Sequence, residues 1–244
     1  MQKYLIKIAF DGTDYHGWQV QPNGVTVQES IQIAMKKLYG YAPDLTGCSR
    51  TDAGVHASEF YCHFSLNNDI VDSGIVAGLN SVLDENIRVL SCKHVDDDFH
   101  CRYNAKRKTY VYKIDNRKIT DPFLSRFSYH YAGNLDIDKM NKFCKTLIGI
   151  HDFEGFSSSN RSVKETVREI YECFITEKDG ILTFSVTGNG FLYNMVRILV
   201  GTAIEVGNGR ISENVAEEIF ETKNRALGGF TAPAKGLFLK KVEY

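Results

Sequence analysis

The sequence predicts an α+β fold, in which two α/β subdomains have mainly antiparallel sheets that join into one extended sheet with helices packed on it. Runs of alternating apolar and polar residues, typical of half-buried strands, recur along the whole chain. Segments with apolar residues at helical spacing lie between these runs, and no glycine- or proline-rich linker interrupts them. With 244 residues, of which 43% are hydrophobic, the chain can form either one large domain or two small ones.

The first half of the chain begins with a strand and a helix. Lys3–Phe10 alternates and ends at the turn signal Asp11-Gly12, which predicts a strand. Thr26 and Glu29 form a capping box ahead of apolar residues at helical spacing, and Gly40 ends the predicted helix. The same patterns then predict a strand, a helix and a second strand, over Phe60–Leu66, Ile75–Val82 and Ile87–Val95.

The second half repeats this order. Thr109–Ile114 is rich in aromatic and branched residues and predicts a strand, and a helix is expected from about Asp136. Two alternating runs flank Lys178-Asp179-Gly180, which is the clearest hairpin signal in the chain. Three further elements complete the prediction: a helix over Phe191–Val206, a shorter helix near Ser212–Glu221 and a strand over Leu237–Val242.

Each half therefore contains a strand–helix–strand–strand unit, which favours two ferredoxin-like or RRM-like subdomains. We place the seam near Asn104, so that residues 1–104 form an N-terminal subdomain and residues 105–244 a C-terminal one. We expect the active-site cleft to lie between them. No short-period repeat is present, which excludes solenoids and propellers.

Charge and cysteine content narrow the class of protein. The six cysteines lack C-x-x-C pairs and zinc-site spacing, so neither disulfides nor structural zinc are expected. The chain has no apolar run near the ~20 residues of a spanning helix and no secretion-like amino terminus, which favours a cytoplasmic protein. The net charge of −1 supplies no overall attraction for nucleic acid. Three clusters could form a local basic face or be ordinary solvated surface: Lys36-Lys37, Lys106-Arg107-Lys108 and Lys240-Lys241.

One polar stretch between two predicted strands, Gly47–Ala57, has the composition of an active-site loop. Small residues surround Arg50, Asp52 and His56, and its glycines permit unusual backbone angles and close approach of a ligand. An ordinary turn with a surface ion pair explains the same spacing equally well. A single loop histidine is more often structural than catalytic, so His56 is not among the expected site residues.

The motifs carry a resemblance that favours the catalytic interpretation. Ser49–Ala57 resembles the catalytic loop of the tRNA pseudouridine synthase A family, and Phe10–Gln19 resembles the amino-terminal segment of that family. Later segments resemble the family in the expected order: Asp98–Tyr103 and on to Tyr110, His151–Phe153, Met195–Arg197 and Thr231–Leu237. Two departures are visible, Ser49 where the family usually has glycine and Gly229-Phe230 before Thr231. The first affects the expected mobility of the loop.

The resemblance implies a tRNA pseudouridine(38–40) synthase that needs no cofactor. It assigns catalysis to Asp52, and a carboxylate is a plausible nucleophile or base for breaking and remaking a glycosidic bond. Whether the carboxylate attacks the base, attacks the sugar or removes a sugar proton stays open. Arg197 would pair with Asp52, Tyr110 would lie against the flipped uracil, and Leu237 would close the apolar side of the pocket. We further hypothesise that Arg50 stacks in the gap that the flipped base leaves.

The resemblance also implies the partners. These are tRNA, with uridines 38, 39 and 40 of the anticodon stem-loop as targets, and a second copy of the chain in a homodimer. Three alternatives remain: a paralogous synthase acting on another RNA, a noncatalytic RNA-binding module, and a hydrolase using Asp52 with His56. The hydrolase alternative has no support from a motif, because the chain contains neither G-x-S-x-G nor H-E-x-x-H.

Overall fold

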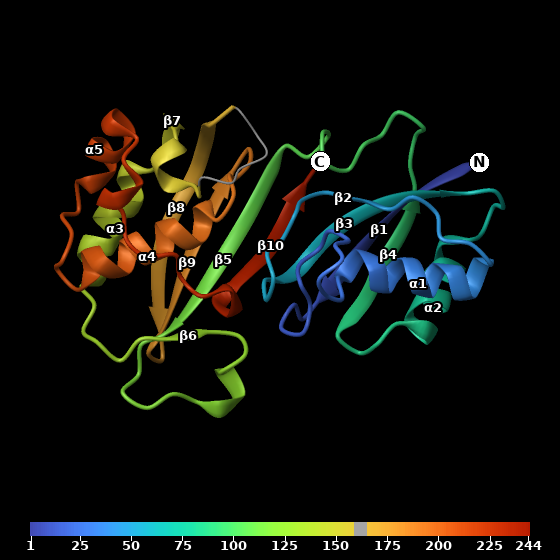
Figure 1. The fold of residues 1–244 in the computed structure, drawn as a ribbon, viewed down its shortest axis with the longest axis horizontal. Helices are drawn as coiled ribbons and strands as arrows, with labels where there is room; N and C mark the ends of the chain where they lie inside the picture. Colours follow the sequence, from blue (N-terminus) through green and yellow to red (C-terminus); the bar gives the residue numbers. More distant parts are fainter. Residues whose placement is uncertain (159–164) are drawn as a thin grey trace. The chain divides into compact units, whose positions relative to one another are not determined.

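A computed structural model describes residues 1–158 and 165–244 of the chain (Figure 1). The chain divides into two compact units, which we describe separately. The first unit comprises Met1–Lys106 together with Phe238–Tyr244, and the second comprises Arg107–Leu237. Both units contain strands as well as helices, which confirms the mixed α+β class.

The first unit has the element order strand, helix, strand, strand, helix, strand, and a strand from the carboxyl end of the chain is added to it. Its elements are β1 (Gln2–Phe10), α1 (Val27–Tyr39), β2 (Thr46–Gly47), β3 (His56–Leu66), α2 (Asp72–Val82), β4 (Ile87–His94) and β10 (Leu237–Glu243). Strands β4, β1 and β3 are neighbours in antiparallel pairs, and β2 pairs antiparallel with β3. This order, β4-β1-β3-β2, is that of a ferredoxin-like sheet. Helices α1 and α2 lie side by side in this unit (Figure 1).

The amino-terminal helix shows why the sequence pattern predicts this fold. Thr26 accepts a hydrogen bond from the Glu29 N–H at 3.3 Å, and Gly40 ends α1 with a left-handed φ of 81°. These contacts satisfy groups that a helix end otherwise leaves open. The apolar face of α1 is buried, with Ile31 and Met35 inaccessible to solvent, so the helix is held by packing as well as by its caps.

The second unit contains a hairpin-based antiparallel sheet and its own helices. Its strands and α-helices are β5 (Arg107–Asp115), β6 (Tyr129–His130), α3 (Ile137–Thr146), β7 (Gly149–Asp152), β8 (Val167–Lys178), β9 (Ile181–Gly188), α4 (Met195–Gly207) and α5 (Val215–Thr222). Its 3-10 helices are Pro122–Leu124, Glu154–Phe156, Arg225–Leu227 and Ala234–Gly236. The strand order is β5-β9-β8-β7 in antiparallel pairs, and α3 packs against both α4 and β8.

The hairpin turn and the start of α4 show where local sequence and structure agree and differ. Asp179 and Gly180 both have positive φ, 54° and 76°, as a two-residue turn between β8 and β9 requires. The long apolar segment begins its helix at Met195 rather than at Phe191. Asn194 has a φ of 59°, and this left-handed residue prevents the helix from extending toward the amino end.

The last strand lies in a different unit from the residues that precede it. The sequence pattern placed Leu237–Val242 in a subdomain of residues 105–244, whereas residues 238–244 cluster with the first unit. The physical reason is pairing, because Phe238 and Leu239 of β10 align in parallel with His56 and Ala57 of β3.

Candidate active site and RNA interface

The loop that carries Asp52 connects β2 to β3 in a tight conformation. The Val55 N–H donates to the Asp52 carbonyl oxygen at 3.1 Å, and Gly54 takes a left-handed φ of 77°. Asp52 is half-buried, whereas Arg50 is exposed. Arg50 and Asp52 are two positions apart on this short segment, so both side chains are presented from one small, polar loop.

The amino-terminal segment clamps this loop through its main chain. The Trp18 N–H donates to the Thr51 carbonyl oxygen at 3.2 Å, and the Gly54 N–H donates to the Tyr15 carbonyl oxygen at 3.2 Å. A β-carbon on Gly17 would collide with the Thr51 carbonyl oxygen. The two segments that resemble the same family, Phe10–Gln19 and Ser49–Ala57, are therefore joined directly by main-chain hydrogen bonds.

The buried side chain of His56 contacts Gly12 and Phe238 at the end of the Asp52 loop. Its ring is 1% exposed, accepts the Gly12 N–H at Nδ1 over 3.0 Å, and stacks on Phe238 with ring centroids 4.6 Å apart. Nδ1 also lies 3.1 Å from Asp11 Oδ1. These contacts give His56 a structural role at the point where the loop enters β3.

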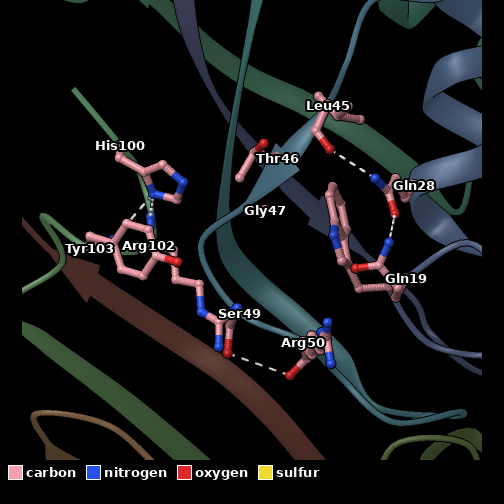
Figure 2. Close-up of a pocket in the computed structure, with 11 residues that line it drawn as sticks. Gln19, Gln28, Leu45, Thr46, Gly47, Ser49, Arg50, His100, Arg102 and Tyr103 are labelled. Atoms are coloured by element: carbon pink, nitrogen blue, oxygen red, sulfur yellow. Dashed lines mark hydrogen bonds between the residues drawn. The ribbon is translucent and has the colours of Figure 1, made fainter. Parts of the chain in front are cut away.

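A polar pocket of about 310 Å³ adjoins the Asp52 loop within the first unit (Figure 2). One wall comes from Trp18 and Gln19, with Gln28 of α1 beside them. The β2 segment and the start of the loop supply the next side, and His100, Arg102 and Tyr103 supply the side opposite Gln28 (Figure 2). The sequence motif that contains the last three residues was part of the resemblance, but it carried no expected role. A pocket is formed by tertiary packing, so only the motif itself could have drawn attention to them.

Arg197 is held in a defined orientation in the second unit. It lies in the first turn of α4, where its Nε donates to the Ala232 carbonyl oxygen at 2.7 Å and its NH1 donates to Asn194 Oδ1 at 2.9 Å. The Ala232 N–H in turn donates to the Arg197 carbonyl oxygen at 3.1 Å. The side chain is therefore tied to the segment that leads into β10, rather than extended into solvent.

Two tyrosines of β5 differ in their surroundings. Tyr112 is fully buried, and its hydroxyl donates to the Pro233 carbonyl oxygen at 2.7 Å. Burial raises the pKa of Tyr112, and the positive charge of Arg197 opposes that rise. Tyr110 is 6% exposed and meets Phe191 edge-on, with ring centroids 5.1 Å apart. Pattern alone did not distinguish the two rings, and both are buried in the structure.

The remaining expected site residue, Leu237, is 5% exposed at the start of β10. The expected residues thus divide between the units: Arg50 and Asp52 lie on one loop of the first, and Tyr110, Arg197 and Leu237 belong to the second.

Within residues 1–158 and 165–244, no three His, Cys, Asp or Glu side chains group as metal ligands would. None of the helices in that part of the chain has the length and apolar character needed to cross a membrane.

Comparison with known proteins connects this geometry to a family. A family model described as tRNA pseudouridine synthase matches residues 143–244. Proteins named tRNA pseudouridine synthase A from Thermoanaerobacter sp. (strain X514) and Clostridium acetobutylicum are 44% and 43% identical to the chain. A Bacillus anthracis protein named tRNA pseudouridine synthase A 2 is 39% identical. Each of these alignments covers 100% of this chain and 100% of the relative.

A solved Cbf5-Nop10-Gar1 complex contains a chain that aligns with 82% of this chain and 54% of its own length, at 13% identity and a TM-score of 0.37. That score is too low to bear on the fold. The identity to the curated relatives is well above what chance allows, and it extends over both units and every segment that carried the resemblance. On this ground the chain belongs to the tRNA pseudouridine synthase family of isomerases.

Proposed function

We propose that this protein converts uridine to pseudouridine at positions 38, 39 and 40 of the tRNA anticodon stem-loop, with Asp52 as the catalytic residue. The observation that carries the proposal is the clamped loop. Asp52 lies in a tight turn whose main chain is bonded to Tyr15 and Trp18, so that its carboxylate is presented from a rigid support. The full-length relatives supply the reaction class, since they are named for it.

The reaction moves one bond within a single nucleotide. The bond from the ribose C1′ to N1 of uracil breaks, a bond from C1′ to C5 forms, and the proton leaves C5 while N1 gains one. No electrons are lost or gained overall, so the reaction calls for proton transfer and covalent catalysis, both of which a carboxylate side chain can provide. Asp52 acts on the base or the sugar of the target nucleotide.

The other four residues bind the substrate in this proposal. A uridine stacked in a stem must leave the helix before its ring can react, at a cost of a few kcal/mol. Arg50 is exposed beside Asp52, and its planar guanidinium can stack in the resulting gap. Tyr110 and Leu237 offer largely buried apolar surface to the uracil, and Arg197 offers a cation whose position two hydrogen bonds fix.

We further propose that the protein works as a homodimer in the cytoplasm and that tRNA contacts both copies. A chain of net charge −1 has little overall attraction for RNA, and pairing two copies would double the basic surface that one tRNA meets. Light scattering of the protein with and without tRNA measures the mass of the assembly. A monomer in both conditions would contradict the dimer and leave the reaction itself untouched.

The test of the reaction is tritium release from C5-labelled uridine in an unmodified tRNA transcript. We expect release by the wild type and a loss of about 10²–10⁴-fold or more in Asp52→Ala and Asp52→Asn. Glu85→Gln, which removes an exposed carboxylate of the same unit, is the matched control and should release tritium normally.

Three outcomes would count against parts of the proposal. Wild-type rates in Asp52→Asn would remove Asp52 from catalysis. Undiminished release from a transcript with cytidine at positions 38, 39 and 40 would place the targets elsewhere. Binding of tRNA without release by the wild type would indicate another RNA substrate or a noncatalytic RNA-binding module.

A further inference from the structure

The pocket beside the Asp52 loop has a rigid back wall. Gln28 of α1 donates from Nε2 to the Leu45 carbonyl oxygen at 2.8 Å, and its Oε1 accepts Gln19 Nε2 at 2.9 Å and the Val20 N–H at 3.0 Å. One side chain thus ties together the helix, the segment before β2 and the segment after Trp18. A site built on such fixed partners loses little entropy when a ligand enters.

The front of the pocket carries unbalanced positive charge. Arg50 and Arg102 are both among the described residues that line it, and no aspartate or glutamate is among them. Neither guanidinium has a hydrogen-bond or ion-pair partner within the described residues, unlike Arg117, which donates to the buried Asp115 at 2.8 Å. Figure 2 shows the Arg102 side chain extending toward the loop that carries Ser49 and Arg50. Two unpaired guanidinium groups at one cavity favour an anion, and arginine suits phosphate in particular.

An aromatic platform stands at the same edge. The Tyr103 side chain is 77% exposed, and one face of its ring stacks on His100 with centroids 4.2 Å apart and an interplanar angle of 28°. His100 Nδ1 faces the main-chain N–H groups of Arg102 at 3.2 Å and Tyr103 at 3.4 Å, which fixes the ring against its own turn. The Asn104 side chain accepts the His100 N–H at 2.6 Å and closes that turn. The Tyr103 ring is therefore held on one face by His100, and most of its surface is open to solvent.

We propose that this pocket is an RNA subsite for one unpaired nucleotide next to the target uridine, with its base on Tyr103 and its phosphate on Arg102. This inference rests on the proposed function. The volume of about 310 Å³ is at the small end of ligand sites, which suits a single nucleotide rather than a helical segment. Exposed aromatic rings beside arginines are the usual surface for single-stranded nucleic acid. Arg50 lines the pocket and lies two positions before Asp52 in the chain, so an RNA strand that passes Arg50 reaches the pocket directly.

A free nucleotide has the same chemistry as a nucleotide within RNA, and the test separates these sources. In the first arm, tRNA affinity, KM and kcat are measured for Tyr103→Leu, Tyr103→Phe and Arg102→Gln. Lys93→Gln, which removes an exposed cation on β4, is the control for charge. We expect Tyr103→Leu to raise KM and Kd about tenfold with kcat nearly unchanged, while Tyr103→Phe, which keeps the ring, behaves as wild type. Arg102→Gln should also lower the slope of log Kd against log salt by about one, and Lys93→Gln should not.

The second arm measures binding of 5′-UMP by titration calorimetry and crosslinking of tRNA that carries 4-thiouridine beside the target. Crosslinks to the peptide containing residues 100–104 support the subsite. Micromolar binding of 5′-UMP that Arg102→Gln abolishes, with tRNA affinity unchanged, would overturn it in favour of a free-nucleotide site. If the wild type releases tritium from tRNA while both Tyr103→Leu and Arg102→Gln bind like Lys93→Gln, the subsite is wrong and the proposed function stands. If the wild type releases none, the proposed function fails first.

Discussion

At the scale of single residues, two histidines of the first unit are buried beside main-chain N–H groups. His56 Nδ1 lies 3.0 Å from the Gly12 N–H, and His63 Nδ1 lies 3.3 Å from the Cys101 N–H. His63 is 8% exposed and touches His100 edge-on, with ring centroids 5.0 Å apart. An imidazole nitrogen that accepts a hydrogen bond carries no proton, so His63 links the sheet to the turn under Tyr103 in its neutral form.

This neutral form makes stability depend on pH. Burial, with the positive charges of Lys3 and His100, lowers the pKa of His63 from 6.5 to about 4. Between these values the unfolded chain binds a proton that the folded protein excludes, so the free energy of unfolding falls as pH falls from 6.5 to about 4. Above 6.5 the stabilisation is fully present, and below about 4 both states are protonated and its loss is complete.

We expect His63→Asn to reduce the slope of the free energy of unfolding against pH, by an amount equivalent to at most one bound proton. The reason is that an amide oxygen can accept the Cys101 N–H without titrating. Denaturant unfolding at several pH values between 4 and 7 measures the slope directly. An unchanged slope would show that another group titrates in this window.

At the scale of elements, the clamp on the Asp52 loop depends on a glycine whose contribution can be isolated. Gly17 and Gly40 have almost equal φ, 82° and 81°, so alanine costs each about 1 kcal/mol in backbone strain. A β-carbon at Gly17 would collide with the Thr51 carbonyl oxygen, whereas one at Gly40 would have no atom of the described residues within 4 Å. The two substitutions therefore differ mainly in whether they displace the loop.

We expect Gly17→Ala to lower kcat about 10²-fold, as small misplacements of catalytic groups do, and Gly40→Ala to leave kcat unchanged. Both variants should lose a few degrees in Tm. Steady-state tritium release and thermal melting of the same preparations provide the comparison. Equal kcat values would mean that the position of this loop does not limit the reaction.

The elements also show how far the sequence determines the fold. Helix α1 and the β8–β9 hairpin were predicted because Thr26, Gly40 and the Asp179-Gly180 turn are local signals that the structure uses as expected. Strands β2 and β6 were not predicted, because two residues cannot display a period. Each forms only where a longer strand offers an edge, β3 for β2 and β5 for β6.

The candidate site was predicted to the extent that it lies in contiguous segments. The Asp52 loop was identified from its composition and resemblance, while the assignment of Asp52, Arg50, Tyr110, Arg197 and Leu237 to roles remains a prediction. Neither the clamp from Trp18 nor the position of the Tyr103 platform at the pocket could be derived from the sequence, since both bring together residues far apart in the chain.

At the scale of the whole molecule, the first unit is discontinuous in sequence. The main chain leaves it after Lys106 and returns at Phe238. Besides the pairing of β10 with β3, the contacts that attach the returning segment include three from its ends: Phe238 stacks on His56, the Lys106 N–H donates to the Glu243 carbonyl oxygen at 2.8 Å, and the Tyr244 hydroxyl donates to the Cys101 carbonyl oxygen at 3.0 Å. The last contact connects this segment to the turn that carries Tyr103.

Removing residues 238–244 should therefore destabilise the first unit, although its other residues remain. We expect hydrogen exchange to accelerate at the start of β3 and across residues 101–106, where these contacts are lost. Tyr244→Phe, which removes one hydrogen bond, should cost only about 1 kcal/mol. Loss of protection confined to the second unit would contradict the division.

The discontinuity also constrains the order of events during synthesis. A ribosome makes residues 1–106 first, yet residues 238–244, which include all of β10 after Leu237, are made only after residues 107–237. Until then, β3 has no partner for the backbone groups of His56 and Ala57 that later face β10. The loop that presents Asp52 enters β3 at this same point, so the strand pairing at the carboxyl end of the loop can form only after β10 has been made.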